Sequence, residues 1–408
     1  MRQMKNSGVE WIGRVPVEWN MKKGKYLYSV QAGYPFNSDH FTLDYGFPLI
    51  RIRDITSGEI GTYYRGEYSD DYIIRKGDCI IGMDGDFNAR IWDNEDALLN
   101  QRCCRIVPHD SILLKWIYYS LPYNLKSIND LAYSTTVKHL SNRDLLEMSV
   151  AYPTLDEQHI RVDYLDSKCS QIDSIIEKQE SIIEKLKEYK NAFISEIISN
   201  ATGVKCNLGL ISHMKNGLNY EFSNEGEHIK ILSVADFKDN YFIQSKDMFS
   251  DVLLDETVPD EYLLRNKDII FVRSNGSKEM VGRAVMVDNI DYRLTYSGFC
   301  IRLRNIREDV IDTEYLLYYF RSPMFRAELE KYSQGSNINN ISQVLLSNIS
   351  IVIPSVKYQR FAIDTIKVTL DKINQMILEI EAVVRRLNDY KKSLIYEVVT
   401  GKKEVCAV

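Results

Sequence analysis

The sequence predicts an α+β fold in which one architecture occurs twice, each copy ending in a long helix. The first observation is a repeat: residues 186–199 read LKEYKNAFISEIIS, and residues 387–400, 201 positions later, read LNDYKKSLIYEVVT. The second is that residues 156–199 and 357–400 contain neither glycine nor proline, as long helices require. The third is the mixture of short apolar runs and helical patterns before each helix.

The composition is that of a globular protein with more than one domain. A chain of 408 residues is too long for one ordinary core, and its 45% apolar and 26% charged residues are normal proportions. The polar start MRQMKNSGVEW lacks the apolar core of a signal peptide, and the apolar runs are too short to cross a bilayer. The seven cysteines show no C-x-x-C spacing. We expect a cytoplasmic protein with reduced thiols and no membrane partner.

The net charge of −6 disfavours nonspecific coating of nucleic acid, which needs many local cations, but it is compatible with a basic reading surface on one face. Bulk charge alone leaves the partner open.

The repeat is strongest at the end of each copy. Residues 140–199 match the segment 201 positions later without a gap, including Pro153 with Pro354 and Gln158 with Gln359. Upstream the match is looser and its offset drifts. Two copies of one architecture with different content is the simplest description.

The first mixed region reads as strands followed by a helix. Leu49–Arg53 alternates apolar and polar residues like a half-buried strand, and Asp78–Met83 and Cys103–Val107 are short apolar strands. A helix is expected at about 112–120. The long helix then begins at residues 154–157, Thr-Leu-Asp-Glu, which form a capping box.

The second mixed region repeats this order. His228–Ile231 alternates polar and apolar residues, and Asp268–Arg273 and Phe299–Arg304 are strand-like. A helix is expected at 313–331, and Ser355 is the expected cap of the second long helix.

Both long helices carry an apolar stripe with the heptad spacing of a coiled coil. With Ile172 at heptad position a, the residues expected to pair the helices are Ile172, Ile175, Ile182, Leu186 and Phe193 in the first helix and Ile373, Met376, Ile380, Leu387 and Leu394 in the second. The economical partner for one stripe is the other, in an orientation that the pattern leaves open. The alternative is that each stripe packs on its own domain or on another subunit.

The sequence lacks the familiar catalytic and metal-binding motifs. It has no G-x-x-x-x-G-K-[ST] loop, no H-E-x-x-H and no G-x-S-x-G, and its six histidines show no metal-ligand spacing. It also lacks an Asn-Pro-Pro or Asp-Pro-Pro followed by an aromatic residue, with which amino-methyltransferases hold a flipped base. Because the motifs of several large enzyme classes are all absent, a binding role is favoured over catalysis.

Two turn-rich runs, GMDGDFNAR at 82–90 and RSNGSKEMVGR at 273–283, carry side chains suited to nucleic acid. Asn and Arg make bidentate contacts to base edges, and Ser and Lys suit phosphates. The polar segments 133–141 and 332–342 and the alternating strands add further candidates. The residues expected to contact DNA are Arg51, Arg53, Asn88, Arg90, Thr136, Lys138, Lys230, Arg273, Ser274, Asn275, Lys278, Arg283 and Asn337. The alternative for the two runs is a solvated hairpin loop, where the same residue types are common.

Further stretches stand at the borders of these elements: SGVEWIGRVPVEW at 7–19, MSVAYPTLDEQ at 148–158, ISIVIPSVKYQ at 349–359, and the doubled helix endings LKEYK and LNDYK. Together they resemble the specificity (S) subunit of type I restriction-modification enzymes. There they correspond to the start of the first recognition domain, two strand-Pro-x-x-x-Glu-Gln junctions and two spacer helices. The resemblance covers essentially the whole chain. It departs at Tyr358, where glutamate is usual, and this puts only that helix cap in doubt.

The resemblance implies a DNA-reading adaptor without an active site of its own. Its variable regions would be target recognition domains, similar to that of N6-adenine methyltransferases, each reading one half of a split, asymmetric site in double-stranded DNA. The helices would pair as an antiparallel coiled coil with pseudo-two-fold symmetry. The expected domains are recognition domain 1 at 1–152, a spacer helix at 153–202, recognition domain 2 at 203–353 and a C-terminal spacer helix at 354–408.

The resemblance also implies partner subunits. Two modification (M) subunits would dock on the helices and bring S-adenosylmethionine and adenine methylation, while restriction (R) subunits would bring ATP-driven translocation and cleavage with Mg²⁺. No cofactor or metal is expected in this chain. Two other interpretations stay open: a coiled-coil scaffold that binds protein only, and a stand-alone DNA methyltransferase or nuclease with unrecognised motifs.

Overall fold

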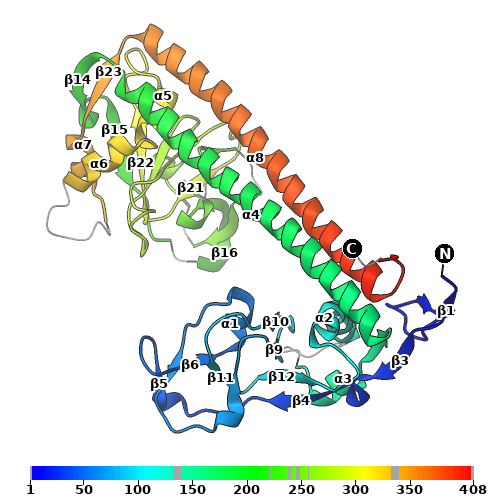
Figure 1. The fold of residues 1–408 in the computed structure, drawn as a ribbon. Coiled ribbons are helices and arrows are strands. Elements are labelled where there is room, and N and C mark those ends of the chain that lie inside the picture. Colours follow the sequence, from blue (N-terminus) through cyan, green and yellow to red (C-terminus); the bar gives the residue numbers. More distant parts are fainter. Residues whose placement is uncertain are drawn as a thin grey trace. The chain divides into compact units, whose positions relative to one another are not determined.

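The computed structural model describes residues 2–131, 139–220, 222–237, 240–244, 249–255, 257–331 and 340–405. The chain forms two compact units: unit 1 is Met1–Gln179 with Ala382–Val408, and unit 2 is Glu180–Glu381. Each unit holds one mixed region of strands and helices and a part of each of two long helices (Figure 1). The α+β architecture in two copies is therefore confirmed. The four-part domain division stays a prediction, because the compact units divide both long helices.

Unit 1 is built on a sheet with the strand order β10–β9–β12–β4, beside a second sheet ordered β5–β7–β6–β11–β8. Short pairs β1–β2 and β13–β3 complete it. Its elements are β1 (Met4–Asn6), β2 (Arg14–Pro16), β3 (Asn20–Lys23), β4 (Tyr28–Ala32), β5 (Phe41–Thr42), β6 (Phe47–Ile50), α1 (Ile52–Ser57), β7 (Tyr63–Tyr64), β8 (Ile73–Ile74), β9 (Cys79–Gly82), β10 (Ala89–Ile91), β11 (Ala97–Leu99), β12 (Cys103–Pro108), α2 (Leu114–Leu131), α3 (Asn142–Glu147) and β13 (Ser149–Tyr152).

Unit 2 repeats this plan with the order β15–β22–β19–β20–β17, together with β18–β16–β21 and the pair β14–β23. The central strands pair alike: Arg105 of β12 lies opposite Ile80 of β9, and Arg302 of β22 lies opposite Ile270 of β19. Its elements are β14 (Gly203–Asn207), β15 (Ser212–Asn216), β16 (Phe222–Leu232), β17 (Phe242–Ile243), β18 (Ser250–Leu254), β19 (Ile269–Val272), β20 (Ala284–Val287), β21 (Leu294–Tyr296), β22 (Cys300–Asn305), α5 (Thr313–Phe320), α6 (Pro323–Lys331), α7 (Gln343–Asn348) and β23 (Ser350–Pro354).

Two expected elements differ from the structure. The strand expected at Leu49–Arg53 ends at Ile50, and α1 begins at Ile52, because the carboxylate of Asp54 accepts the main-chain N–H of Arg51 at 2.9 Å and caps a helix there. The helix expected at 313–331 is divided into α5 and α6, since Pro323 lacks the N–H needed to continue a helix and instead begins the second one.

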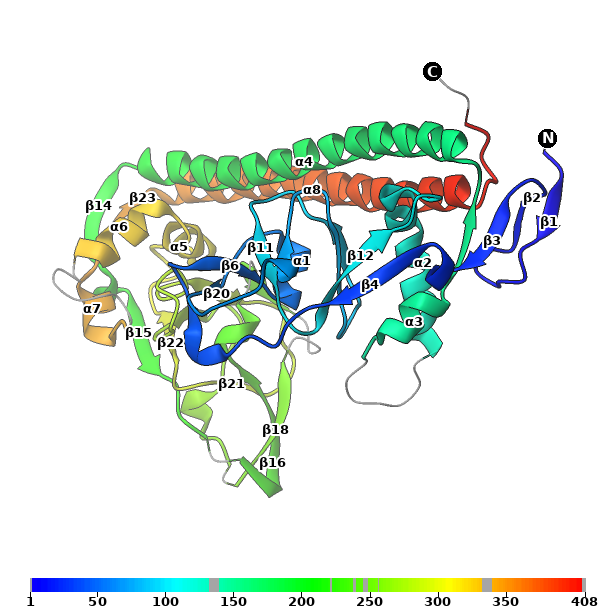
Figure 2. The ribbon, with the colours of Figure 1, turned by 60° about the horizontal axis from the view of Figure 1, so that its bottom comes forward.

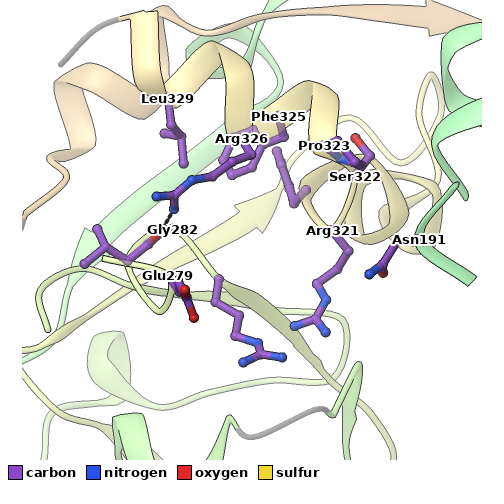
Figure 3. A pocket seen from close by; sticks show the side chains of 12 residues that line it. Asn191, Glu279, Gly282, Arg321, Ser322, Pro323, Phe325, Arg326 and Leu329 are labelled. Atoms are coloured by element: carbon purple, nitrogen blue, oxygen red, sulfur yellow. Dashed lines mark hydrogen bonds between the residues drawn. The ribbon is translucent and has the colours of Figure 1, made fainter. Parts of the chain in front are cut away.

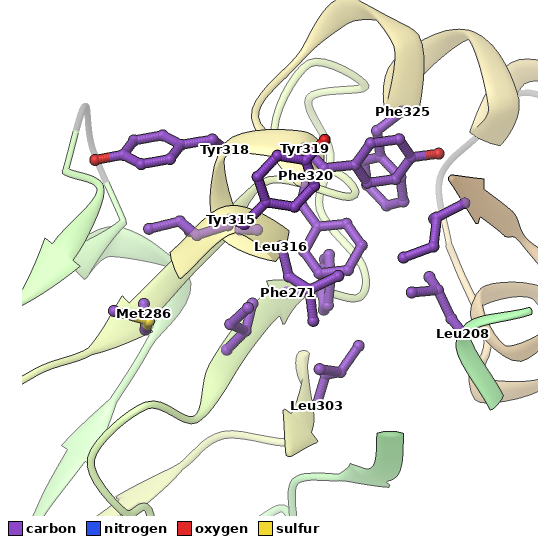
Figure 4. Packing of buried hydrophobic residues seen from close by; sticks show 14 of the residues in the cluster. Leu208, Phe271, Met286, Leu303, Tyr315, Leu316, Tyr318, Tyr319, Phe320 and Phe325 are labelled. Atoms are coloured by element: carbon purple, nitrogen blue, oxygen red, sulfur yellow. The ribbon is translucent and has the colours of Figure 1, made fainter. Parts of the chain in front are cut away.

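The core of unit 2 forms where α5 and α6 pack on the central strands. Phe271 of β19 lies 4.8 Å, ring centre to ring centre, from Phe320 of α5, and Phe325 of α6 lies 5.0 Å from the same ring (Figure 4). Edge-on packing of such rings adds about 1 kcal/mol per pair to the burial of their area. These contacts fix the sheet relative to the helices and so position the turns at the strand ends.

A buried glutamine explains why the junction before each long helix is repeated. In unit 1, the Gln158 side chain accepts the main-chain N–H of Leu113 at 2.9 Å and donates to the carbonyl of Pro153 at 3.0 Å. In unit 2, Gln359 accepts from Asp312 at 2.7 Å and donates to Pro354 at 2.9 Å. Buried main-chain groups need such partners. The glutamine therefore ties the start of each long helix to the loop before α2 or α5.

The long helices α4 (Leu155–Ser199) and α8 (Val356–Val399) pack against each other and run antiparallel (Figure 2). In unit 1, the ammonium of Lys391 contacts the carboxylate of Asp173 at 2.6 Å. In unit 2, Lys190 donates to the side chain of Asn374 at 3.3 Å. From the first contact to the second, the residue number rises along α4 and falls along α8. The antiparallel pairing is therefore confirmed.

The expected heptad phase is wrong for three of the ten pairing residues. Ile175, Ile182 and Met376 are 44%, 41% and 48% exposed and do not lie on the contact face. Leu387 and Leu394 pack with Ile172 in one cluster, Phe193 packs on the unit 2 core, Ile373 is buried, and Leu186 and Ile380 are half-buried. The seam, meaning the line of residues along which the two long helices contact each other, therefore follows the neighbouring residues Ile176, Ile183, Ile377 and Val384. It keeps alternating three- and four-residue steps, as a coiled coil requires.

Candidate nucleic-acid interface

In unit 1, two polar segments that are far apart in the sequence meet at the end of β9. Asp84, in the turn after β9, forms an isolated antiparallel bridge with His139, and the N–H of Leu140 donates to the carbonyl of Met83 at 2.7 Å. The run 82–90 and the end of the segment 133–141 therefore lie side by side. Thr136 and Lys138 lie outside the described residues.

The carboxylate of Asp84 is the centre of a small charged cluster at this point. One oxygen lies 2.7 Å from Nδ1 of His139, and the other lies 2.5 Å from Nη1 of Arg102. The Asp84 side chain is only 14% exposed, whereas those of His139 and Arg102 are 59% and 62% exposed. Desolvation opposes ionisation of Asp84, but the hydrogen bonds and charges of His139 and Arg102 outweigh it and lower the pKa of the carboxyl.

Sequence reasoning missed Arg102 and His139 as site residues. Arg102 lies in the tight turn between β11 and β12, with a left-handed φ of 69° that is uncommon for a residue other than glycine. The available signal was the polar triplet Asn-Gln-Arg at 100–102 between two buried apolar runs. His139 stood within a segment recognised as polar, but nothing local connected it to Asp84.

The other candidates in unit 1 gather around α1 and are engaged in local bonds. Asn88 donates to the hydroxyl of Thr56 at 3.1 Å, Arg90 pairs with Asp93 at 3.1 Å, and Arg53 donates to Thr62 at 3.1 Å. The guanidinium of Arg90 also covers Gly58, where an added Cβ would lie 2.4 Å from Nη2. Arg51 is the exposed N-cap residue of α1. Contact of these residues with DNA stays a prediction.

Unit 2 brings the equivalent segments together. Ser274 bridges Asn340, and the N–H of Ile341 donates to the carbonyl of Arg273 at 2.9 Å. Asn275 accepts the N–H of Ser277 at 2.8 Å within its turn. The remaining candidates are placed as follows: Arg273 donates to the carbonyl of Gly298 at 3.3 Å, Lys230 pairs with Asp251 at 2.9 Å, and Asn337 lies outside the described residues.

A cleft of about 440 Å³ adjoins the turn 273–283 in unit 2 (Figure 3). Arg283, Arg321 and Arg326 line it together with Glu279. Arg326 donates to the carbonyls of Val281 at 2.9 Å and Lys278 at 3.1 Å, so α6 holds the turn in place. Arg321 lies over the ring of Tyr241 at 4.3 Å. The cleft gives the turn a basic flank.

Within the described part of the chain, no group of three or more His, Cys, Asp or Glu side chains is arranged to hold a metal ion. Of the helices in these ranges, none has both the length and the apolar character that a membrane span needs.

Comparison with known proteins gives a consistent result. The family model described as "Type I restriction modification DNA specificity domain" matches residues 16–188 and 222–382, which is most of the chain. The chain is similar to the type I restriction enzyme EcoBI specificity subunit of Escherichia coli, with 41% identity over 173 residues, 42% of this chain and 36% of that protein. It is also similar to the StySPI specificity subunit of Salmonella potsdam, with 23% identity over 96% of this chain and 90% of that protein.

Among solved structures, the fold is similar to a chain described under "complex assembly and conformational transition of the type I R-M system". The TM-score is 0.69, and the match covers 95% of this chain and 99% of that one. At 14% identity this likeness concerns the fold alone.

Proposed function

The chain belongs to the type I restriction modification DNA specificity family, and we propose that it reads a bipartite DNA site for a type I restriction-modification complex. Each unit reads one half of the site. Partner subunits then methylate adenine at that site or cleave the DNA. In this role the chain supplies recognition and does no chemistry itself.

The observation that carries this proposal is one backbone scaffold built twice with different side chains at its polar turns. The end of β9 and the end of β19 are joined to the same neighbouring segments by equivalent main-chain bonds. The residues displayed there differ, as shown by Asp84 and His139 against Ser274 and Asn340. A reader of two unlike half-sites requires such a pair, since direct readout depends on the side chains presented to the base edges.

The exposed faces of the long helices support two copies of one protein partner. On α4, Ile175, Ile182 and Tyr189 are exposed at seven-residue spacing; on α8, Met376, Val383 and Tyr390 occupy the positions 201 residues later and are exposed as well. A row of exposed large apolar side chains marks an interaction surface rather than a solvated helix face. Because the same row occurs twice, we propose that two methyltransferase (M) subunits dock there.

The cofactors follow from this division of labour. S-adenosylmethionine belongs to the M subunits, and ATP and Mg²⁺ belong to the restriction (R) subunits. Such an assembly acts on chromosomal and foreign DNA in the cytoplasm.

The test is the methylome of the host, sequenced by long reads with and without this gene. We expect a split, asymmetric adenine-methylated motif that disappears when the gene is deleted. An unchanged methylome would favour a protein-only scaffold and overturn the proposal. Binding of S-adenosylmethionine by the purified chain alone would instead indicate a stand-alone methyltransferase.

A further inference from the structure

The two units hold three turn segments together with the same main-chain bonds. In unit 1, the N–H of Met83 donates to the carbonyl of Arg102 at 2.8 Å, and the N–H of Leu140 donates to the carbonyl of Met83 at 2.7 Å. In unit 2, Arg273 takes the place of Met83: its N–H donates to Phe299 at 2.7 Å, and its carbonyl accepts from Ile341 at 2.9 Å. Arg102 and Phe299 therefore occupy equivalent positions.

The side chains at these equivalent positions differ in kind. Unit 1 presents an exposed guanidinium and an exposed imidazole, both held by the shielded carboxylate of Asp84. Unit 2 presents Phe299, which is exposed and apolar, at the position of Arg102. A position whose backbone is fixed while its side chain changes in character is suited to setting specificity.

The anchoring by Asp84 favours base reading over phosphate binding. An ionised Asp84 offsets the charge of Arg102, which weakens its attraction to phosphates, the sequence-independent part of DNA binding. The guanidinium has five N–H donors in a fixed plane, and the contact to Asp84 uses Nη1, so donors remain for a second partner. The acceptors O6 and N7 of guanine match such a pair of donors.

On the basis of the proposed function, we propose that Arg102 and His139, positioned by Asp84, read a guanine-containing base pair in the half-site of unit 1. Asp84 is a positioning residue in this scheme, whereas Arg102 and His139 touch the base edges. Unit 2 lacks the donor at this position, so it reads the corresponding step of its own half-site in another way.

The experiment compares full-length variants in the complete complex, with methylation measured on a library that varies every position of the site. For Arg102→Ala we expect discrimination at one G·C pair of one half-site to fall roughly 5- to 100-fold. The other half-site and the gap should stay unchanged. The left-handed backbone at position 102 is about equally unfavourable for arginine and alanine, so the substitution should change the free energy of folding little. Asp84→Asn should weaken the same discrimination and steepen the salt dependence of binding, because the charge of Arg102 is no longer offset.

Two controls separate the outcomes. Arg143→Ala removes the same charge from an exposed position on α3 of unit 1 and should leave base preference unchanged. Phe299→Ala should alter the other half-site only. Equal loss of methylation on all sequences, or no change, for Arg102→Ala would overturn the inference while the proposed function stands. If the wild-type complex shows no base preference at all, the proposed function itself fails.

Discussion

Unit 1 and unit 2 share their main-chain plan but differ in one of the buried side chains that hold it. Gln158 and Gln359 make equivalent bonds to the main chain at their helix starts. By contrast, buried Arg161 in unit 1 has Ala362 as its counterpart 201 residues later, and that alanine is buried too. The bonds at the start of each long helix are therefore kept in both copies, whereas Arg161 holds main-chain carbonyls of Val398 and Lys403 in unit 1 alone, because the alanine of unit 2 has no side-chain donor.

The largest expected effect is the loss of Arg161, which makes unit 1 resemble unit 2 at this position. Its guanidinium contacts Glu157 at 2.8 Å, donates to the carbonyl of Lys403 at 3.0 Å and lies 4.9 Å from the Trp19 ring. Burial lowers its pKa despite the pairing with Glu157. Arg161→Ala leaves these groups without their partner and should destabilise unit 1 by about 3 kcal/mol, measured by calorimetry.

The matched control is Lys168→Ala, an exposed cation on the same helix, which should change the free energy of unfolding by less than about 0.5 kcal/mol. Equal changes in the free energy of unfolding for the two substitutions would mean that the contacts of Arg161 with Lys403 and Trp19 do not stabilise unit 1.

A medium effect is expected from the seam between the long helices. Ile183 is buried and Ile182 is exposed, although the two residues are adjacent and identical in kind. Ile183→Ala should lower the free energy of unfolding of unit 2 by about 2 kcal/mol, because it deletes buried methyl groups and leaves a cavity. Ile182→Ala should have almost no effect on stability in denaturant titrations and should weaken binding of an M subunit. A larger loss of stability for Ile182→Ala would restore the phase that the heptad pattern predicted.

The smallest effect is expected where the two units carry the same lysine with different partners. Lys391 pairs with Asp173 in unit 1, whereas Lys190 meets Asn374 in unit 2. Asp173→Asn should destabilise unit 1 by about 0.5 kcal/mol, and Asn374→Asp should stabilise unit 2 by a similar amount, because exposed ion pairs are weak. Both differences should shrink in about 1 M salt, where the charges are screened. Changes in the free energy of unfolding that stay the same at high salt would show that packing, and not charge, holds these pairs.

Much of the architecture was predictable because it depends on local pattern. The long helices follow from runs without glycine or proline, and the central strands at Cys79–Gly82 and Ile269–Val272 follow from short apolar runs. The phase of the seam was not predictable, because the doublets at 175–176 and 182–183 offer isoleucine at both positions and only tertiary packing decides between them. The antiparallel direction came from family resemblance rather than from the heptad pattern.

The site was harder to predict than the fold. The runs 82–90 and 273–283 were recognised from composition, and the structure brings each beside the second polar segment of its own unit. The link from Asp84 to Arg102 was invisible, because it depends on the pairing of β9 with β12 and on a turn that follows another strand. At Arg51 the alternating pattern predicts a strand, but the hydrogen bond from its N–H to Asp54 begins a helix there instead.

The bonds that join the turns after β9 and β19 to their neighbouring segments have an evolutionary consequence. They use main-chain N–H and C=O groups, which nearly every amino acid supplies. Substitution at positions 84, 102 and 139, or at 274, 299 and 340, therefore leaves the main-chain bonds between these turns in place. On the proposed function, a lineage can change its target at these positions while the main-chain bonds of the turns are kept.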